Sequence, residues 1–106
     1  MSTTIADMRV DPEALAALCR RHGVRRLDLF GSAATGGFDP ARSDVDLLVE
    51  LAELPPGDYA DAYFGLLAGL EALFGRKVDL LTRAALVNPH LRRRVEAERR
   101  TLFVAA

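Results

Sequence analysis

Two aspartates separated by a single residue, Asp44 and Asp46, are the side chains in this sequence whose type and spacing best suit chemistry. The residues that follow, 47–49, are apolar, which predicts a strand and partial burial. Side chains two apart on a strand project from the same face, about 7 Å apart along the backbone, so both carboxylates can reach one site. Like charges this close repel each other, and a divalent cation relieves that repulsion. Because no His or Cys is near them in the sequence, the pair predicts a hard ion such as Mg²⁺.

A glycine-rich segment, Gly31 to Gly37, precedes this pair and is suited to binding an anion. It directly follows a predicted strand, and glycines let backbone N–H groups approach a phosphate closely, while the Ser32 hydroxyl adds a donor. The segment is neither a Walker A loop nor a Rossmann loop, because its residues do not fit either spacing. A triphosphate is the anion that fits best beside a Mg²⁺ site.

A third carboxylate, Asp79, lies in the short apolar segment 78–81. Flanked by Val78 and Leu80, it is expected to point to the opposite face of its strand. If that strand pairs beside 44–51, Asp79 joins the other two aspartates, and three carboxylates can hold two metal ions. A two-metal site activates an attacking hydroxyl and stabilises the leaving oxygen of a displacement at phosphorus. Asp79 would then be the candidate general base.

The elements that must position these groups follow from capping residues and periodicity. Asp11 and Pro12 are typical of a helix start, and Gly23 of a helix end. We expect the following order: helix 12–22, strand 25–30, a loop or single helical turn at 31–37, strand 44–51, a helix from Gly57 or Asp58 to about Phe74, strand 78–81, helix 90–100, and an edge strand or clasp at 102–104. This order predicts an α+β or α/β fold, with a small mixed sheet of three to four strands and helices packed on it.

Length and composition set broader bounds. A chain of 106 residues with 14 basic and 15 acidic residues and a net charge of −1 predicts one domain spanning 1–106. Stable DNA binding is not expected from so balanced a charge, and no apolar stretch is long enough to suggest a membrane span. The lone Cys19 and an N-terminus without the layout of a signal peptide indicate a cytoplasmic protein.

The segments Leu29–Gly36 and Arg42–Val49, with Asp79 and the closing stretch 88–102, resemble the minimal nucleotidyltransferases of the DNA polymerase beta-like superfamily. The resemblance covers the chain from about Pro12. It implies that superfamily's fold and the transfer of AMP from ATP to a hydroxyl with release of pyrophosphate. It also implies two Mg²⁺ ions at Asp44, Asp46 and Asp79, which would be both metal ligands and catalytic residues. The residues expected to bind the nucleotide are Gly31, Ser32, Thr35, Gly36 and Arg42.

One position departs from the family's pattern. Many members carry Arg where this sequence has Thr35. The loss of a cation facing the phosphates would lower activity or shift nucleotide preference, and Arg42 and Lys77 are the candidate substitutes.

The resemblance also implies a partner. Stand-alone domains of this family work beside a small all-helical HEPN-type protein, often a ribonuclease toxin, which they neutralise by adenylylation, also called AMPylation. The chain is therefore expected to be the antitoxin of a toxin–antitoxin pair, to form a hetero-oligomer, and to modify a Tyr, Ser or Thr hydroxyl. Two alternatives remain open: a catalytically weak or inactive module that neutralises its partner by occlusion, and nucleotide addition to a small molecule or an RNA end. The second generally needs a further domain to hold the acceptor.

Other conspicuous side chains are expected to be structural. Asp28 lies mid-strand, opposite the predicted core face, and Cys19 is a small core residue. Tyr59 and Tyr63 have helical spacing and are expected to pack in the core with their hydroxyls at its rim. The arginine-rich stretch 92–100 is expected to form a solvated helix face, with docking of a partner or RNA as the functional alternative.

Overall fold

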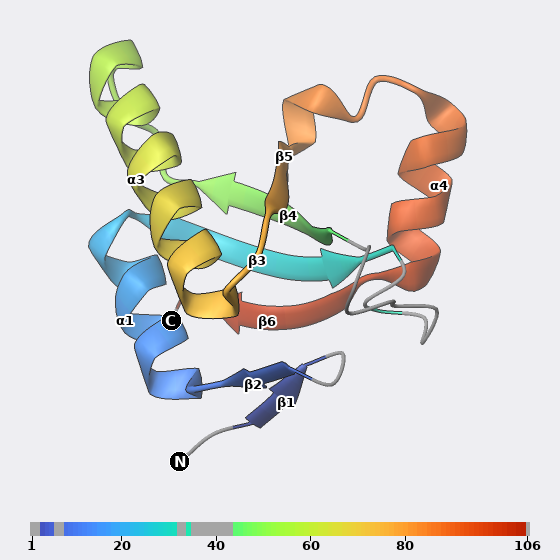
Figure 1. The fold of residues 1–106 in the computed structure, drawn as a ribbon. Helices are drawn as coiled ribbons and strands as arrows, with labels where there is room; N and C mark the ends of the chain where they lie inside the picture. The colour runs from blue at the N-terminus through green and yellow to red at the C-terminus, as the bar shows by residue number, and fades with distance from the viewer. Residues whose placement is uncertain (1–2, 6–7, 32–33, 35–43, 106) are drawn as a thin grey trace.

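The fold is α+β, with a mixed sheet and helices on both of its faces; the computed structural model describes residues 3–5, 8–31, 34 and 44–105 (Figure 1). Within these ranges the main sheet has four strands in the order β5-β4-β3-β6. The central strands β3 (Val24–Phe30) and β4 (Val45–Leu51) are antiparallel, as are β3 and β6 (Arg100–Val104). Strand β5 (Val78–Thr82) runs parallel to β4. The pairing of the two aspartate-bearing strands, the condition for bringing Asp79 to the other two aspartates, is thus observed.

The helices begin and end where the capping residues predict, to within a few residues. Helix α1 (Pro12–Arg21) starts at Asp11, whose carboxylate accepts the Glu13 N–H at 3.0 Å, and ends at His22. Helix α3 (Pro56–Phe74) ends at Gly75, which has a left-handed φ of +68°. Helix α4 (Pro89–Glu98) starts at Asn88, whose side chain accepts the His90 N–H at 2.8 Å. None of the described helices is long and apolar enough to cross a bilayer.

Several boundaries and elements differ from the sequence-based expectation. Helix α3 begins at Pro56 rather than Gly57 or Asp58, because proline is well accommodated in a first helical turn. Helix α4 stops at Glu98 rather than 100, because Arg99 is extended and Arg100 begins the pairing of β6 with β3. The short hairpin of β1 (Thr3–Ile5) and β2 (Met8–Val10) and the 3₁₀ turn η1 (Arg83–Ala85) were not expected.

Two apolar layers cover the two faces of the sheet. The larger lies between the sheet and helices α1 and α3, and the smaller lies between the opposite face and α4 (Figure 1). Alternate residues of β4 enter different layers: Val45, Leu47 and Val49 the larger, Leu48 the smaller. This alternation leaves Asp46 on the α4 side of the sheet.

Asp28 is a buried charged residue: only 1% of its surface is exposed. It lies in the middle of β3, and its carboxylate accepts hydrogen bonds from Arg26 Nε at 2.9 and 3.1 Å. Arg99, which ends α4, places its Nη1 4.0 Å from the same carboxylate. As expected from the sequence, the surroundings of Asp28 are structural: it ties β3 to the segment that joins α4 to β6.

Replacing Asp28 by Asn should destabilise the protein by about 2 kcal/mol, because the change keeps the volume but leaves the arginines beside it without their counter-charge. Urea unfolding followed by circular dichroism measures the change. Asp61→Asn, on an exposed residue of α3, is the matched control and should shift the free energy of unfolding by less than about 0.5 kcal/mol. Equal effects from the two variants would contradict this role for Asp28.

Candidate active site

Asp46 and Asp79 are directly paired in the register of the parallel strands β4 and β5. Their neighbours Val45, Leu47, Val78 and Leu80 are buried in the larger core, so both aspartates belong to the opposite face. Asp46 is half-buried, whereas Asp79 is exposed. The register therefore places two carboxylates side by side, one partly withdrawn from solvent and one open to it.

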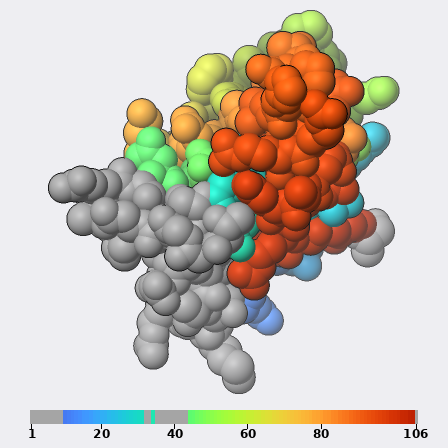
Figure 2. Space-filling view, turned by 90° about the vertical axis from the view of Figure 1, so that its right-hand side faces the viewer, coloured from blue at the N-terminus to red at the C-terminus, as the bar shows by residue number. Residues whose placement is uncertain are grey.

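Asp44 lies immediately before β4 and completes this acidic group. The Val45 N–H next to it donates to the Lys77 carbonyl at 3.1 Å, which holds the starts of β4 and β5 together. The Lys77 ammonium lies 4.0 Å from Asp44 Oδ2, and both side chains are substantially exposed. The three predicted carboxylates thus gather where β4 and β5 begin, and Figure 2 shows the start of β4 (green) at the surface on the side of the molecule that bears α4 (orange-red).

Gly31 follows β3 and lies against Asp46. Its φ is +71°, and a Cβ built on it would overlap the Asp46 carboxylate, with its Cγ only 3.2 Å away. Phe30, the preceding residue, is paired with Asp46 in the β3–β4 register. The sequence predicts that Gly31 offers its N–H group to phosphate; the structure adds a steric reason for glycine, because only the missing side chain leaves room for Asp46.

The charges around Asp46 act on its protonation. Burial raises the pKa of the Asp46 carboxyl, and the neighbouring carboxylates of Asp79 and Asp44 raise it further. Arg94 of α4 opposes this rise, and Glu98 adds to it. Ionised Asp46 is therefore held in an unfavourable environment, which is the condition that a bound cation would relieve.

Helix α4 contributes charges to this site that the sequence reasoning did not assign. Arg94 and Glu98 form an ion pair of 3.3 Å along the helix, and both influence Asp46. Their spacing of four residues predicts the ion pair. Nothing in the sequence shows that α4 crosses the sheet beside β4, so their nearness to Asp46 could not be found there.

The donor set fits a hard divalent cation supplied with further ligands by a substrate. All three candidate ligands are carboxylates, which Mg²⁺ prefers, and Mg²⁺ usually keeps waters and phosphate oxygens in its shell. Within the described ranges, no group of three or more Asp, Glu, His or Cys side chains is arranged so that it could hold a metal ion by itself. The arrangement therefore suits an ion shared between protein carboxylates and phosphates rather than one enclosed by the protein.

Four of the residues expected to bind nucleotide, Ser32, Thr35, Gly36 and Arg42, lie outside the described residues. Their assignment stays a prediction. The fifth, Gly31, is described and lies beside Asp46.

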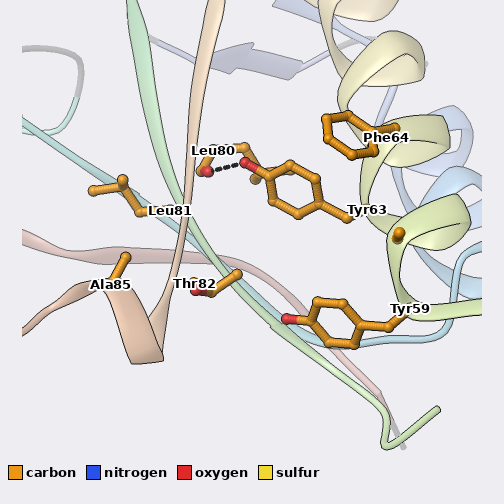
Figure 3. Close-up of a pocket in the computed structure, with 8 residues that line it drawn as sticks. Tyr59, Tyr63, Phe64, Leu80, Leu81, Thr82 and Ala85 are labelled. Carbon is orange, nitrogen blue, oxygen red and sulfur yellow. Dashed lines mark hydrogen bonds between the residues drawn. The ribbon is translucent and has the colours of Figure 1, made fainter. Parts of the chain in front are cut away.

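A separate, mostly apolar pocket of about 400 Å³ lies between α3 and β5 (Figure 3). Tyr59, Tyr63 and Phe64 line one side of it, and Leu81 and Thr82 the other. The Tyr63 hydroxyl donates a hydrogen bond to the Leu80 carbonyl, while Phe64 is 64% exposed. Burial, the neighbouring Tyr59 and then Asp79 raise the pKa of Tyr63. The expected packing of these tyrosines at the rim of the core is observed.

The mixed sheet thus carries paired aspartates, with a sharply turned glycine against one of them. Comparison with known proteins shows the class of protein. The sequence profile of the Nucleotidyltransferase domain family, NTP_transf_2, matches residues 12–102. The chain belongs to this nucleotidyltransferase family.

Relatives of known sequence carry more specific names. A protein of Methanocaldococcus jannaschii, provisionally named protein adenylyltransferase MJ1379, is 33% identical over 78 residues, which are 74% of this chain and 76% of the relative. Protein adenylyltransferase MntA of Thermococcus cleftensis is 39% identical over 69 residues, or 65% of this chain and 66% of the relative. These names describe the relatives.

Solved structures share the fold. A chain provisionally described as a minimal nucleotidyltransferase is 39% identical, with a TM-score of 0.64 over 84% of this chain and 86% of that one. A toxin–antitoxin complex with AMP-PNP superposes with a TM-score of 0.65 at 22% identity, over 91% of this chain and 75% of that one. The MNT antitoxin bound to a tri-AMPylated HEPN toxin of Shewanella oneidensis gives a TM-score of 0.57 at 21% identity, over 89% and 70% of the two chains.

Gly31→Ala should destabilise the protein more than Gly75→Ala, because both glycines have φ near +70° but only Gly31 has a neighbour in the way. The left-handed backbone alone costs an alanine about 1–2 kcal/mol. The Asp46 carboxylate must also move in Gly31→Ala, whereas nothing lies within 4 Å of a Cβ at Gly75. Equal losses of unfolding free energy in Gly31→Ala and Gly75→Ala, measured by urea unfolding, would show that Asp46 is not confined by Gly31.

Asp46→Asn should raise the melting temperature of the metal-free protein at pH 7 by about 2–4 °C. The raised pKa means that ionised Asp46 opposes folding, and this penalty disappears as the pH falls and the carboxyl takes up a proton. The gain over wild type should therefore shrink as the pH is lowered. The exposed Glu53→Gln serves as the charge-matched control. An unchanged or lower melting temperature for Asp46→Asn would contradict the conclusion that ionised Asp46 opposes folding.

Proposed function

We propose that this nucleotidyltransferase is a Mg²⁺-dependent protein adenylyltransferase that moves AMP from ATP to a Tyr, Ser or Thr hydroxyl of a partner protein. The observation that carries the proposal is the placement of Asp46 opposite Asp79, with Asp44 and Gly31 beside them. The names of the relatives support the choice of a protein as acceptor.

In this proposal each described residue has a distinct task. Asp44 and Asp46 would hold the metal, with Asp79 as a further ligand, and the metal would supply charge stabilisation at the phosphates. Gly31 keeps the backbone close to Asp46 and leaves room for it. Asp79, which is open to solvent, faces the side from which an acceptor can arrive.

The proposed reaction is a displacement at the α-phosphorus of ATP. The acceptor oxygen forms a bond to the α-phosphorus, the bond from that phosphorus to the bridging oxygen breaks, and pyrophosphate leaves. The proton of the acceptor hydroxyl passes to the Asp79 carboxylate, which is the general base in this scheme. Because ATP is the donor, the cytoplasm is the proposed location.

The proposed partner is a HEPN-type toxin, for which this chain would act as the antitoxin in a hetero-oligomer. Support comes from a structural neighbour described as an MNT antitoxin in complex with a tri-AMPylated HEPN toxin. We propose that residues 1–106 act as a single catalytic domain in this complex.

Incubation of the protein with Mg²⁺, ATP and the product of its neighbouring gene tests the proposal. The partner should gain the mass of one or more AMP groups, and chelation of Mg²⁺ should abolish the gain. Asp44→Asn, Asp46→Asn and Asp79→Asn should each reduce transfer by at least about 100-fold, as expected when an electrostatic or proton-transfer group is lost. The exposed Asp61→Asn is the matched control.

The competing function is a binding module that neutralises its partner by occlusion, and Thr35, where many family members carry arginine, favours it. A partner that binds tightly and loses activity without any AMP transfer would establish the occlusion module instead. Transfer that is undiminished in the double variant Asp44→Asn with Asp46→Asn would refute the assigned site.

A further inference from the structure

Lys77 is the single lysine of the sequence, and it lies at the acidic site. Its ammonium is 4.0 Å from Asp44 Oδ2, next to the start of β5 that carries Asp79. All of the other basic residues except the two histidines are arginines. A primary ammonium is thus placed beside the carboxylates proposed to hold the metal.

The backbone of Lys77 is fixed while its side chain extends into solvent. Its carbonyl accepts the Val45 N–H at 3.1 Å, which positions the residue relative to Asp44. The side chain is 71% exposed, and an ion pair that long and that exposed adds little to stability. The sheet therefore positions the backbone of Lys77, and the fold does not depend on the contact of its ammonium with Asp44.

Three described arginines on the α4 side of the sheet, Arg26, Arg94 and Arg99, lie within 4.0 Å of carboxylates. Arg94 pairs with Glu98 at 3.3 Å, and Arg99 lies 3.5 Å from Glu96 and 4.0 Å from Asp28. Arg26 donates to Asp28. Among these four cations, Lys77 has the most exposed side chain, at 71% against 67% for Arg94, and its contact with Asp44 is, at 4.0 Å, as long as that of Arg99 with Asp28.

A multiply negative triphosphate has to enter a site that already contains Asp44, Asp46 and Asp79. Favourable binding there requires positive charge beyond the metal, and cations aimed at phosphates are a general means of providing it.

We propose that Lys77 contacts the triphosphate of the bound nucleotide and supplies positive charge beside Asp44. This inference rests on the proposed function, because it assigns a role in the same site. The ammonium exchanges its contact with Asp44 for one with phosphate oxygens, which requires rotation of its flexible side chain but no change in the backbone. Lys77 is therefore a nucleotide-binding residue of this chain.

Equilibrium binding of a non-hydrolysable ATP analogue with Mg²⁺ gives the first test. Lys77→Met should weaken binding about tenfold, the loss expected for one hydrogen bond from a charged group to phosphate, and Lys77→Arg should retain most of the affinity. Arg83→Met removes an equal charge just beyond the other end of β5 and should leave binding within twofold of wild type. Binding within twofold of wild type in Lys77→Met, or an equal loss in Arg83→Met, would overturn the proposal.

Because there is only one lysine, amine modification gives a second readout that a merely structural role would not move. Wild-type protein is treated with an acetylating reagent, and the fraction of Lys77 that is modified is measured by peptide mass spectrometry. The ATP analogue with Mg²⁺ should protect Lys77 at least fivefold, and Mg²⁺ alone should not. Equal modification under the two conditions would contradict contact with the nucleotide.

These two readouts separate this inference from the proposed function. Wild type that transfers AMP, together with a Lys77→Met variant of unchanged affinity, would overturn the role of Lys77 alone. Wild type that binds the analogue through Lys77 but transfers no AMP would overturn the proposed transfer and uphold this inference. A wild-type protein that does not bind the analogue would overturn both.

Discussion

The strand register that sets Asp46 beside Asp79 is the constraint on which the candidate site depends. Strand β4 pairs with β5 in parallel and with β3 in antiparallel orientation. These two pairings bring the carboxylates and the Gly31 turn together. The apolar residues that alternate with them are buried against α1 and α3, so the strands cannot turn over to separate the charges. Burial of the core thus offsets the unfavourable electrostatics of the site.

The same alternation explains what the sequence could predict. The Asp44-x-Asp46 spacing fixes both side chains to one face, and the placement of Asp79 between Val78 and Leu80 fixes its face in the same way. These local rules hold because they depend only on the geometry of a strand. Strand order needed one further assumption, that the segments around Asp46 and Asp79 are neighbours, and the structure confirms it.

Features that depend on distant contacts were beyond the reach of the sequence. Residues 3–5 and 8–10 form a hairpin although neither has a strong strand pattern, and Arg100 joins β6 because β3 offers a partner edge. The steric role of Gly31 also required the β3–β4 register, since the residue that it accommodates is 15 positions later in the chain. The nucleotide-binding assignments of Ser32, Thr35, Gly36 and Arg42 stay predictions.

The hydrogen bond from Tyr63 to the Leu80 carbonyl bears on how a partner can approach. Strand β5 ends the described order of the sheet, and the free edge of such a strand invites another chain to add a strand of its own. At Leu80, however, a tyrosine from α3 already uses the carbonyl that an added strand would need. A strand added at this edge would therefore have to displace the Tyr63 hydroxyl from the Leu80 carbonyl.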